Sequence, residues 1–357
     1  MIRKSTLSLN SANVGKLQKL RELVQEYQCV IQAYIDRLWE WEIFQGSFVK
    51  QDILDEVTTW LSAAAKQCAG KQALQIVKSQ RKKKNKTKPE FRGNVVELDS
   101  RLLVIQEGRN KFDLWITFRG LGKYNPILLP AQRHKHFLGF TNWERKKSAR
   151  LRIEAQGLFL DVFFEQEAPK PKSGFALGLD CGYLKLAVTS DGQVLGTELS
   201  AKAEKISRKT QGSKAFKRAL IERDQYIDYT VKQLDLMGIG TIVVEALKNV
   251  KHKSKGKIQR KVMNKLQRWT YPRFLSRLSQ WCEISGVRIH STAPAYTSQQ
   301  CSSCGFIHKE NRAGESFRCG RCGHAEDADF NASKNILNRF IFPEATEPGL
   351  QVVPSVC

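Results

Sequence analysis

Four cysteines in the C-terminal part of the chain have the spacing of a metal site. Cys301 and Cys304 form one C-x2-C pair, and Cys319 and Cys322 form a second pair after residues 305–318. Each pair can present two thiolates to one ion, and two pairs complete the tetrahedral four-sulfur shell that suits zinc. A redox dithiol is the alternative, but it does not require two matched pairs. We therefore expect a structural Zn²⁺ ion, and because sulfur fills every position we expect no catalysis at it.

Three carboxylates stand where strands end or a helix begins. Asp180 closes the apolar run FALGLD, Glu245 closes TIVVE, and Asp329 precedes the helical pattern NASKNILN. Each carboxylate taken singly is more simply a turn residue or a helix cap. Taken together, they can meet at the carboxyl edge of one sheet, where open α/β sheets place their sites. These oxygen donors suit two Mg²⁺ ions that activate a water and stabilise the leaving oxygen of a phosphodiester. Asp327 is the alternative third acid.

The elements that must position these acids follow a definite order along the chain. The patterns predict a strand, two hairpin strands, a helix, a strand, a helix, another strand and a final helix, over residues 175–182, 184–200, 213–237, 240–247, 271–285, 287–291 and 331–340. This is the order of an RNase H-like fold, in which nucleases carry their acids on the first strand, the fourth strand and the last helix. We expect this domain over residues 175–296 and 325–342, with the cysteine module inserted at 297–324.

The first half of the chain has a different pattern. Apolar residues recur at helical steps between residues 11 and 80, and alternating strands of a small barrel or sandwich follow up to residue 167. The segment APKPKSG at 168–174 is typical of a linker. Residues 343–357 have no pattern, and we expect them to be disordered. The chain is therefore predicted to be a multidomain α/β protein.

The composition indicates a polyanionic partner. The chain has 59 Lys and Arg against 35 Asp and Glu, a formal net charge of +24. Such an excess is costly for folding and is typical of nucleic-acid-binding proteins. The cations that we expect to contact nucleic acid lie in three basic runs: Arg81, Lys82, Lys83, Lys84, Lys214, Lys217, Arg218, Lys253, Lys255, Lys257 and Arg260. Neither a long apolar run nor a secretory signal is visible, so we expect no membrane partner and an intracellular, cytoplasmic location, in a prokaryote.

The motifs as a set resemble a known family. The segments GLDCGYLKLAVTSDG, IVVEALKNV, APAYTSQQCSSCG and CGHAEDADFNASKNI look like the three RuvC motifs and the zinc ribbon of TnpB. TnpB proteins are transposon-encoded RNA-guided nucleases from which type V CRISPR effectors descend. The resemblance covers about residues 170–340. By resemblance, Asp180, Glu245 and Asp329 match the metal-binding acids of these motifs.

The resemblance also implies an architecture and an activity. Residues 1–10 and 90–167 correspond to a wedge-like β-barrel, and residues 11–89 to a helical recognition lobe inserted into it. The implied activity is Mg²⁺-dependent cleavage of a target DNA that pairs with a structured guide RNA, next to a short motif read by the protein. Because the lobe is small, the RNA can itself act as scaffold or the protein can form a homodimer, so monomer and homodimer both stay open.

Three alternative functions stay open. A miniature type V CRISPR nuclease would have the same chemistry and take its guide from a CRISPR array. An RNA-guided DNA-binding repressor would bind without cleavage, although such proteins lose their acids and the chain retains Asp180, Glu245 and Asp329. An unguided resolvase-like nuclease would cut branched DNA without RNA.

Overall fold

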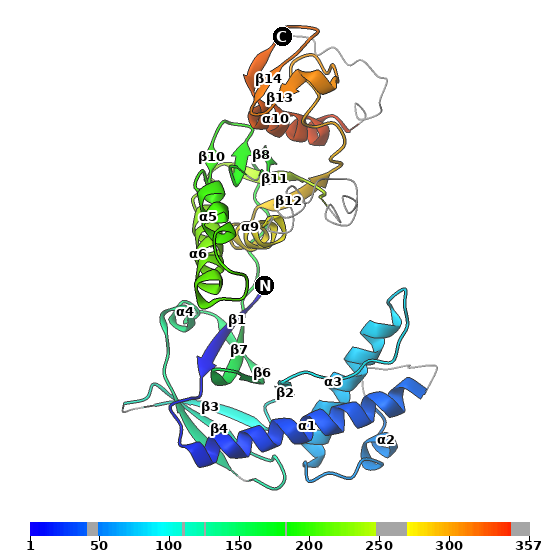
Figure 1. The fold of residues 1–357 in the computed structure, drawn as a ribbon. Coiled ribbons are helices and arrows are strands. Elements are labelled where there is room, and N and C mark those ends of the chain that lie inside the picture. Colours follow the sequence, from blue (N-terminus) through cyan, green and yellow to red (C-terminus); the bar gives the residue numbers. More distant parts are fainter. Residues whose placement is uncertain (41–48, 109–110, 125, 183, 248–269, 344–357) are drawn as a thin grey trace. The chain divides into compact units, whose positions relative to one another are not determined.

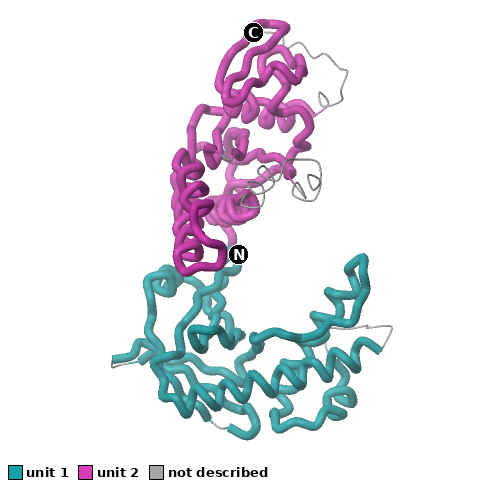
Figure 2. The backbone as a smooth tube through the Cα atoms, viewed as in Figure 1, with its two compact units in different colours: residues 1–167 teal, residues 168–357 magenta. Residues whose placement is uncertain are grey.

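The chain folds into two compact units. The computed structural model describes residues 1–40, 49–108, 111–124, 126–182, 184–247 and 270–343. The units comprise residues 1–167 and 168–357, and each is described by itself (Figure 2). The division falls where the predicted linker begins. Both units combine helices and sheets, so the predicted multidomain α/β class is confirmed. The expected disordered tail lies outside the described residues, except Pro343.

Unit 1 contains a four-stranded antiparallel sheet in the order β1-β7-β6-β2. Its strands are β1 (Ile2–Ser8), β2 (Val95–Leu98), β6 (Glu144–Glu154) and β7 (Gly157–Glu165). Side chains alternate between the two faces of a strand, and here the apolar ones lie on one face. Leu7, Leu151 and Val162 are therefore buried in the core of unit 1.

A second sheet of unit 1 has the order β3-β4-β5. It consists of β3 (Leu103–Glu107), β4 (Leu114–Phe118) and β5 (Ile127–Ala131), and the short helix α4 (Lys135–Leu138) follows it. Apolar side chains of both sheets belong to one core. Because the strands divide between two hydrogen-bonded sheets, the closed wedge-like barrel stays a prediction.

In the described part of the predicted segment 11–89, three helices lie between β1 and β2 along the chain. They are α1 (Val14–Glu40), α2 (Gln51–Asp55) and α3 (Ala63–Arg81), and α1 packs against α3 (Figure 1). The apolar stripe of α1 repeats at helical steps, and Leu20, Tyr27 and Tyr34 on it are fully buried. Ser62 caps α3 because its hydroxyl accepts the N–H of Ala65 at 3.2 Å.

Unit 2 is built on a five-stranded sheet in the order β10-β9-β8-β11-β12. Its strands are β8 (Phe175–Asp180), β9 (Ala187–Thr189), β10 (Val194–Leu195), β11 (Ile239–Glu245) and β12 (Arg288–Thr292). Strands β8, β11 and β12 are parallel, whereas β9 and β10 form the predicted hairpin beside β8. Along the described chain, these strands and helices follow the predicted order, except that a helix at Leu199–Ser207, which the sequence did not predict, precedes the predicted helix.

Helices cover both faces of this sheet. They are α5 (Leu199–Ser207), α6 (Lys214–Val231), α9 (Tyr271–Ser285) and α10 (Ala328–Ile341). Helices α6 and α9 lie on one face and α10 on the other (Figure 1). A Cβ atom added at Gly178 in β8 would lie only 2.2 Å from the carbonyl oxygen of Ser333 in α10. The glycine therefore lets the helix backbone approach the central strand directly.

A small three-stranded sheet with the order β13-β14-β15 forms the cysteine module. Its strands are β13 (Arg312–Ala313), β14 (Ser316–Arg318) and β15 (Ala325–Asp327), and the 3₁₀ turn η1 (Lys309–Asn311) precedes them. Because β15 pairs with β14, the module continues to Asp327 instead of ending at the predicted residue 324.

The end of the predicted linker, residues 168–174, packs against other residues. The backbone N–H of Lys172 donates to Gly286 O at 2.8 Å, and a Cβ atom at Gly174 would lie 2.4 Å from Gly238 O. The end of the linker thus packs against unit 2.

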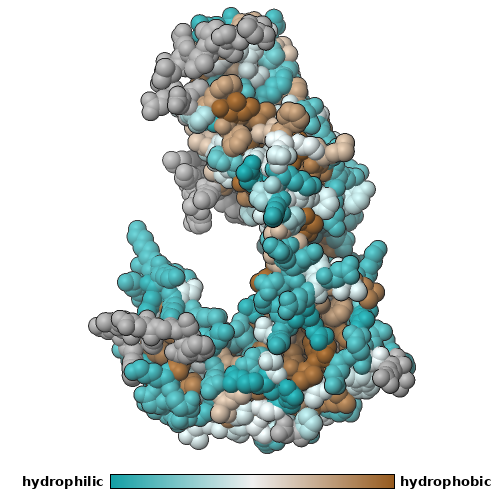
Figure 3. All heavy atoms as spheres, turned by 180° about the vertical axis from the view of Figure 1, so that it is seen from behind, coloured by the Kyte–Doolittle hydropathy of each residue, from teal (hydrophilic) through white to brown (hydrophobic). Residues whose placement is uncertain are grey.

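The surface agrees with the hydrophilic composition. Hydrophilic residues cover much of the visible surface of each unit (Figure 3). In the described part of the chain, none of the helices combines the length and the apolar character that crossing a bilayer requires.

Candidate metal centres: a four-cysteine site and a carboxylate cluster

The four predicted cysteine ligands lie together in the module. The sulfurs of Cys301, Cys304, Cys319 and Cys322 all lie within 4.8 Å of one another. The distance is 3.8 Å between the sulfurs of Cys301 and Cys322 and 3.6 Å between those of Cys304 and Cys319. Zn–S bonds of about 2.3 Å in a tetrahedron require sulfurs about 3.8 Å apart. The geometry therefore fits one zinc ion with a complete sulfur shell.

The two cysteine pairs have the same local backbone. Gly305 N donates to Cys301 O, and Gly323 N donates to Cys319 O, each at 3.0 Å. Both glycines have φ +75°, a left-handed conformation that closes the turn and favours glycine. In the second pair the N–H of Cys322 also points at Cys319 Sγ, at 3.5 Å. This repeated turn explains why the C-x2-C-G spacing predicts the site from sequence alone.

Asp180 ends the central strand β8 on the face that α10 covers. It lies two residues after Gly178, and β8 pairs in parallel with β11, so that the next neighbour along the register is Glu245. Burial raises the pKa of Asp180 to about 7, and the negative charges of Glu245 and Asp329 raise it further. The structure therefore brings the three predicted acids close enough to influence one another.

Glu245 is held by a neighbouring hydroxyl. Burial raises the pKa of its carboxyl group, whereas a hydrogen bond from Thr297 and the charges of Arg339 and Arg312 oppose that rise. Thr297 Oγ1 donates to Glu245 Oε1 and is itself buried. The hydroxyl thus fixes the orientation of one carboxylate oxygen.

Asp329 lies in the first turn of α10 and is 9% exposed. Its Oδ1 accepts from Arg312 Nη2 at 2.8 Å, and its Oδ2 lies 3.8 Å from Lys185 Nζ. Arg312 belongs to the cysteine module, and Lys185 belongs to the loop after β8. Cations from two separate segments therefore orient this acid.

Asp327 has a different position from Asp329. It is the N-cap of α10, and its Oδ1 accepts the N–H groups of Asp329 and Phe330, each at 3.0 Å. Its Oδ2 accepts from Lys185 at 2.8 Å. Burial raises the pKa of Asp327, but the bonds from Lys185 and the helix backbone prevail and leave this pKa below its ordinary value. Both of its oxygens are thus occupied within the protein.

The acids are more widely spaced than the cysteines. Among the described residues, the cysteines form the one group with three or more potential ligand atoms within 4.8 Å of one another. The charges of Glu245 and Asp329 act on Asp180, but the three carboxylates do not form such a group.

Side chains of α10 join the module to the sheet. Asn331 Oδ1 accepts from Ser302 N at 2.9 Å, and its Nδ2 donates to Gln300 O at 2.8 Å. Asn335 Nδ2 donates to Thr297 O at 2.9 Å. Both asparagines are buried, so their amides are fixed in these bonds.

Sequence reasoning did not identify three residues that contact the acids, namely Lys185, Thr297 and Arg312. They come from loops and a short strand, where no periodicity indicates which way a side chain points. The signal for Thr297 is its place in APAYTSQQC, four residues before the first cysteine. No comparable local signal marks Lys185 or Arg312.

The predicted nucleic-acid contacts lie apart from this cluster in the chain. Lys82, Lys83 and Lys84 are exposed after α3, whereas Arg81 donates to the carbonyl of Trp39 at 2.8 Å and helps to hold the end of α1. Residues 253–260, which contain Lys253, Lys255, Lys257 and Arg260, lie outside the described residues.

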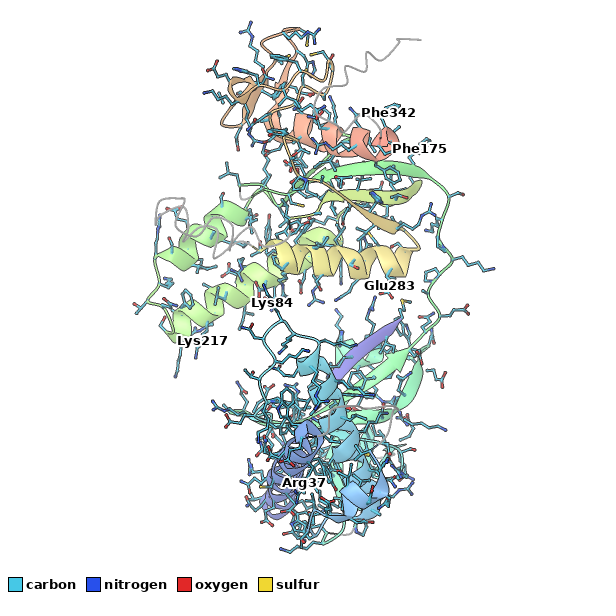
Figure 4. All side chains as sticks on the ribbon, turned by 90° about the vertical axis from the view of Figure 1, so that its right-hand side faces the viewer. Arg37, Lys84, Phe175, Lys217, Glu283 and Phe342 are labelled. Atoms are coloured by element: carbon cyan, nitrogen blue, oxygen red, sulfur yellow. The ribbon has the colours of Figure 1, made fainter. Side chains whose placement is uncertain are left out.

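The third basic run begins α6. Lys214, Lys217 and Arg218 are exposed there. Within unit 2, Lys217 lies at the opposite end from Phe175 and Phe342 (Figure 4).

Comparison with known proteins finds a family model that matches the region of the cysteine module. Residues 271–336 match the family model "Cas12f1-like, TNB domain". The chain is 36% identical over 114 residues to the CRISPR-associated endodeoxyribonuclease Cas12f1 of Sulfoacidibacillus thermotolerans, a match that covers 31% of this chain and 25% of that protein. It is 31% identical over 216 residues to the putative RNA-guided DNA endonuclease InsQ of Escherichia coli, covering 50% of this chain and 53% of that protein. The chain thus spans about a quarter to a half of these relatives.

One solved structure aligns with the chain at a low structural score. It is the cryo-EM structure of a Cas12f1–sgRNA–target DNA complex, with 15% identity, a TM-score of 0.36 and coverage of 95% of this chain and 99% of that chain. The sequence matches are the stronger finding. They confirm the relationship to the TnpB family and to the miniature type V effectors that the motifs indicate, and residues 271–336 match the model of the Cas12f1-like TNB domain.

Proposed function

We propose that the protein is an RNA-guided DNA endonuclease that hydrolyses a phosphodiester with Mg²⁺ at a RuvC-like, RNase H-type site. The observation that carries this proposal is the meeting of Asp180, Glu245 and Asp329 at one edge of the sheet of unit 2. Burial and mutual repulsion raise the pKa of Asp180 to about 7. Several carboxylates are rarely buried together unless cations or protons compensate their charge.

The three acids that would bind the metal ions come from two strands and a helix. Asp180 and Glu245 lie on neighbouring parallel strands, and Asp329 lies on the helix that covers the same face. Thr297 orients Glu245, while Arg312 and Lys185 orient Asp329. When bound, two Mg²⁺ ions would supply an activated water and charge stabilisation at the leaving oxygen. The zinc site, with its closed sulfur shell, would shape the module and take no part in hydrolysis.

Asp329 is favoured over Asp327 as the third acid. Its charge contributes to the raised pKa of Asp180. Asp327 instead caps α10 and pairs with Lys185. We assign Asp327 the role of holding the first turn of the helix, so that Asp329 is correctly placed.

Guidance by RNA is supported by the relatives and by charge. InsQ is named a putative RNA-guided DNA endonuclease, and the Cas12f1 relatives are named CRISPR-associated endodeoxyribonucleases. A net charge of +24 suits a protein that holds a guide–target heteroduplex by its phosphates. A CRISPR-derived guide is the second candidate, favoured by the higher identity to Cas12f1, whereas InsQ matches a larger share of the chain.

The decisive experiment combines RNA analysis with paired variants. The protein is purified from cells that carry its native locus, the copurified RNA is sequenced, and cleavage of matching DNA is measured with Mg²⁺ and with EDTA. We expect a discrete structured RNA and cleavage that requires Mg²⁺. Asp329→Asn should lower the cleavage rate at least about a hundredfold with RNA retained. Asp327→Asn should keep most of the activity and of the stability, because asparagine caps a helix about as well as aspartate does.

The outcomes separate the alternatives. Absence of a discrete RNA would contradict the guided mechanism, and cleavage of branched DNA without RNA would favour a resolvase-like nuclease. Guided binding without cleavage by the unmodified chain would favour a repressor. Greater loss of cleavage in Asp327→Asn than in Asp329→Asn would reverse the assignment of the third acid.

A further inference from the structure

The turn before the cysteine module contains an unusual backbone conformation. Tyr296 has φ +62°, and it is the one residue other than glycine with a positive φ in the ranges that the structure describes. In this left-handed region the Cβ atom of an L-amino acid lies too close to the backbone, so glycine is favoured. A residue held there is a pointer to function when the surroundings impose the conformation.

Side chains of α10 impose the conformation of this turn. Arg339 Nη1 donates to Ala293 O at 2.6 Å, and Asn335 Nδ2 donates to Thr297 O at 2.9 Å. The carbonyl of Tyr296 accepts two backbone N–H groups from further along the turn, at 2.9 and 3.0 Å. The backbone on both sides of Tyr296 is therefore fixed by hydrogen bonds.

The ring of Tyr296 makes few stabilising contacts within the protein. The residue is 54% exposed. Among the described residues, neither a hydrogen-bond partner of its phenol hydroxyl nor a stacked ring is found. Packing within the described chain therefore does not offset the strain of the backbone.

Tyr296 lies next to the carboxylate cluster. Thr297 is the following residue, it is 3% exposed, and its hydroxyl donates to Glu245 Oε1. The charge of Glu245 in turn acts on Asp180. An exposed aromatic ring thus stands one residue from a direct contact to a proposed metal ligand.

We propose that Tyr296 contacts the substrate, with its ring stacked on a nucleobase of the single DNA strand that enters the carboxylate cluster. This inference rests on the proposed function and names a residue that positions its substrate. An aromatic face binds any base with little sequence preference, which suits a nuclease whose sequence choice comes from a guide. Hydrogen bonds hold the backbone of Tyr296 directly before Thr297, the residue that contacts Glu245, so a base stacked on the ring would keep the strand close to the acids.

The test compares three substitutions of Tyr296. Tyr296→Phe keeps the ring, Tyr296→Ala removes it, and Tyr296→Gly removes it while relieving the strained backbone. Each is made alone and together with Asp180→Asn, and binding of a short single-stranded DNA containing 2-aminopurine is measured in the Asp180→Asn background. Tyr229→Ala is the matched control, because Tyr229 is 63% exposed on α6, away from the acids in the chain.

We expect Tyr296→Ala and Tyr296→Gly to weaken binding of the strand about tenfold or more and to lower cleavage to a similar extent. They should also lose the quenching of 2-aminopurine that stacking causes. Tyr296→Phe and Tyr229→Ala should resemble the unmodified protein. Tyr296→Gly should have an unchanged or higher melting temperature, so its defect cannot come from unfolding.

Unchanged binding, quenching and cleavage in Tyr296→Gly would overturn the inference. The binding arm does not depend on catalysis. A chain that binds the strand through Tyr296 but never cleaves it would contradict the proposed nuclease and leave this contact intact. A chain that cleaves normally without the ring would contradict the contact and leave the nuclease intact.

Discussion

At the scale of single residues, the raised pKa of Asp180 has a measurable consequence for stability. Its folded-state pKa of about 7 exceeds the ordinary value of 3.8, mainly because the carboxyl group is buried. The protonated form is therefore favoured by folding. The contribution of this group to stability is fully present below about pH 4 and is lost as the pH rises through about 7.

This linkage predicts that Asp180→Asn is more stable than the unmodified chain at high pH in the absence of divalent ions. The free energy of unfolding should be higher by about 1–3 kcal/mol at about pH 8, and the difference should vanish towards about pH 4. Chemical denaturation in EDTA across this pH range measures it. Glu315→Gln, at an exposed position, is the control, and its free energy of unfolding should change with pH as that of the unmodified chain does. A difference that does not depend on pH would show that ionisation of Asp180 is not its cause.

Single residues also differ in whether the sequence alone can predict their place in the site. Cys301 and its three partners follow from spacing, since the turn that brings each pair together is local. Asp180 and Glu245 follow from the ends of apolar strands. The choice between Asp327 and Asp329 does not, because it depends on where the helix begins. The pattern predicts residues 331–340, whereas α10 begins at Ala328 and takes Asp327 as its cap.

At the scale of elements, β8 and α10 must pack closely, because they hold Asp180 and Asp329 of the carboxylate cluster. Gly178 allows it, since any Cβ atom would meet the backbone of Ser333. The sequence shows an apolar strand with a glycine in it, but not which helix approaches that glycine. Only the folded topology brings residues 178 and 333 together. The same reason explains why Lys185 and Arg312 were not predicted.

Gly178→Ala should therefore separate the helix from the strand. We expect a loss of about 1–3 kcal/mol in the free energy of unfolding, because a helix backbone cannot yield as a flexible side chain can. Cleavage should fall as well, since Asp180 and Asp329 lie on the two separated elements. Thermal unfolding and cleavage assays measure the two effects. Gly320→Ala is the control, because its Cβ atom would lie 3.8 Å from the nearest atom. Equal stability of the two variants would contradict this account.

The cysteine module is the second element on which the acids depend. It supplies Arg312, which orients Asp329, and its first residues bond to Asn331 of α10. Cys319→Ser should therefore lower the zinc content from about one ion per chain and also reduce cleavage, although the shell itself is not catalytic. Metal analysis and cleavage assays check both. Cys29→Ser, at an exposed position outside the module, should change neither. Loss of zinc with full cleavage would show that the acids do not need the module.

At the scale of the whole molecule, the excess of positive charge should govern affinity for nucleic acid. The start of α6 is a defined part of that charge, since Lys214, Lys217 and Arg218 are exposed and none has an ion pair with another described residue. Each cation that contacts a phosphate adds about one to the slope of log affinity against log salt.

Replacing these three cations of α6 by Gln should weaken RNA binding at low salt about tenfold or more and reduce that slope by up to about three. Titrations at several salt concentrations measure both quantities. Lys202 and Lys205 offer a control pair, because both already pair with Glu222. An equal effect of the control substitutions would indicate that total charge matters and the location on α6 does not.

The pairing of β1 with β7 also bears on how the chain acquires its structure. Ile2 lies opposite Glu165, so the first strand finds its place beside the last strand of unit 1. Everything between them, including α1 and α3, forms a loop that this pairing closes. Contacts so distant along the chain slow folding, because the loop must lose its freedom before the contact forms. During synthesis, β1 can therefore pair only after β7 has been made. By contrast, the sheet of unit 2 draws all its strands from residues made later.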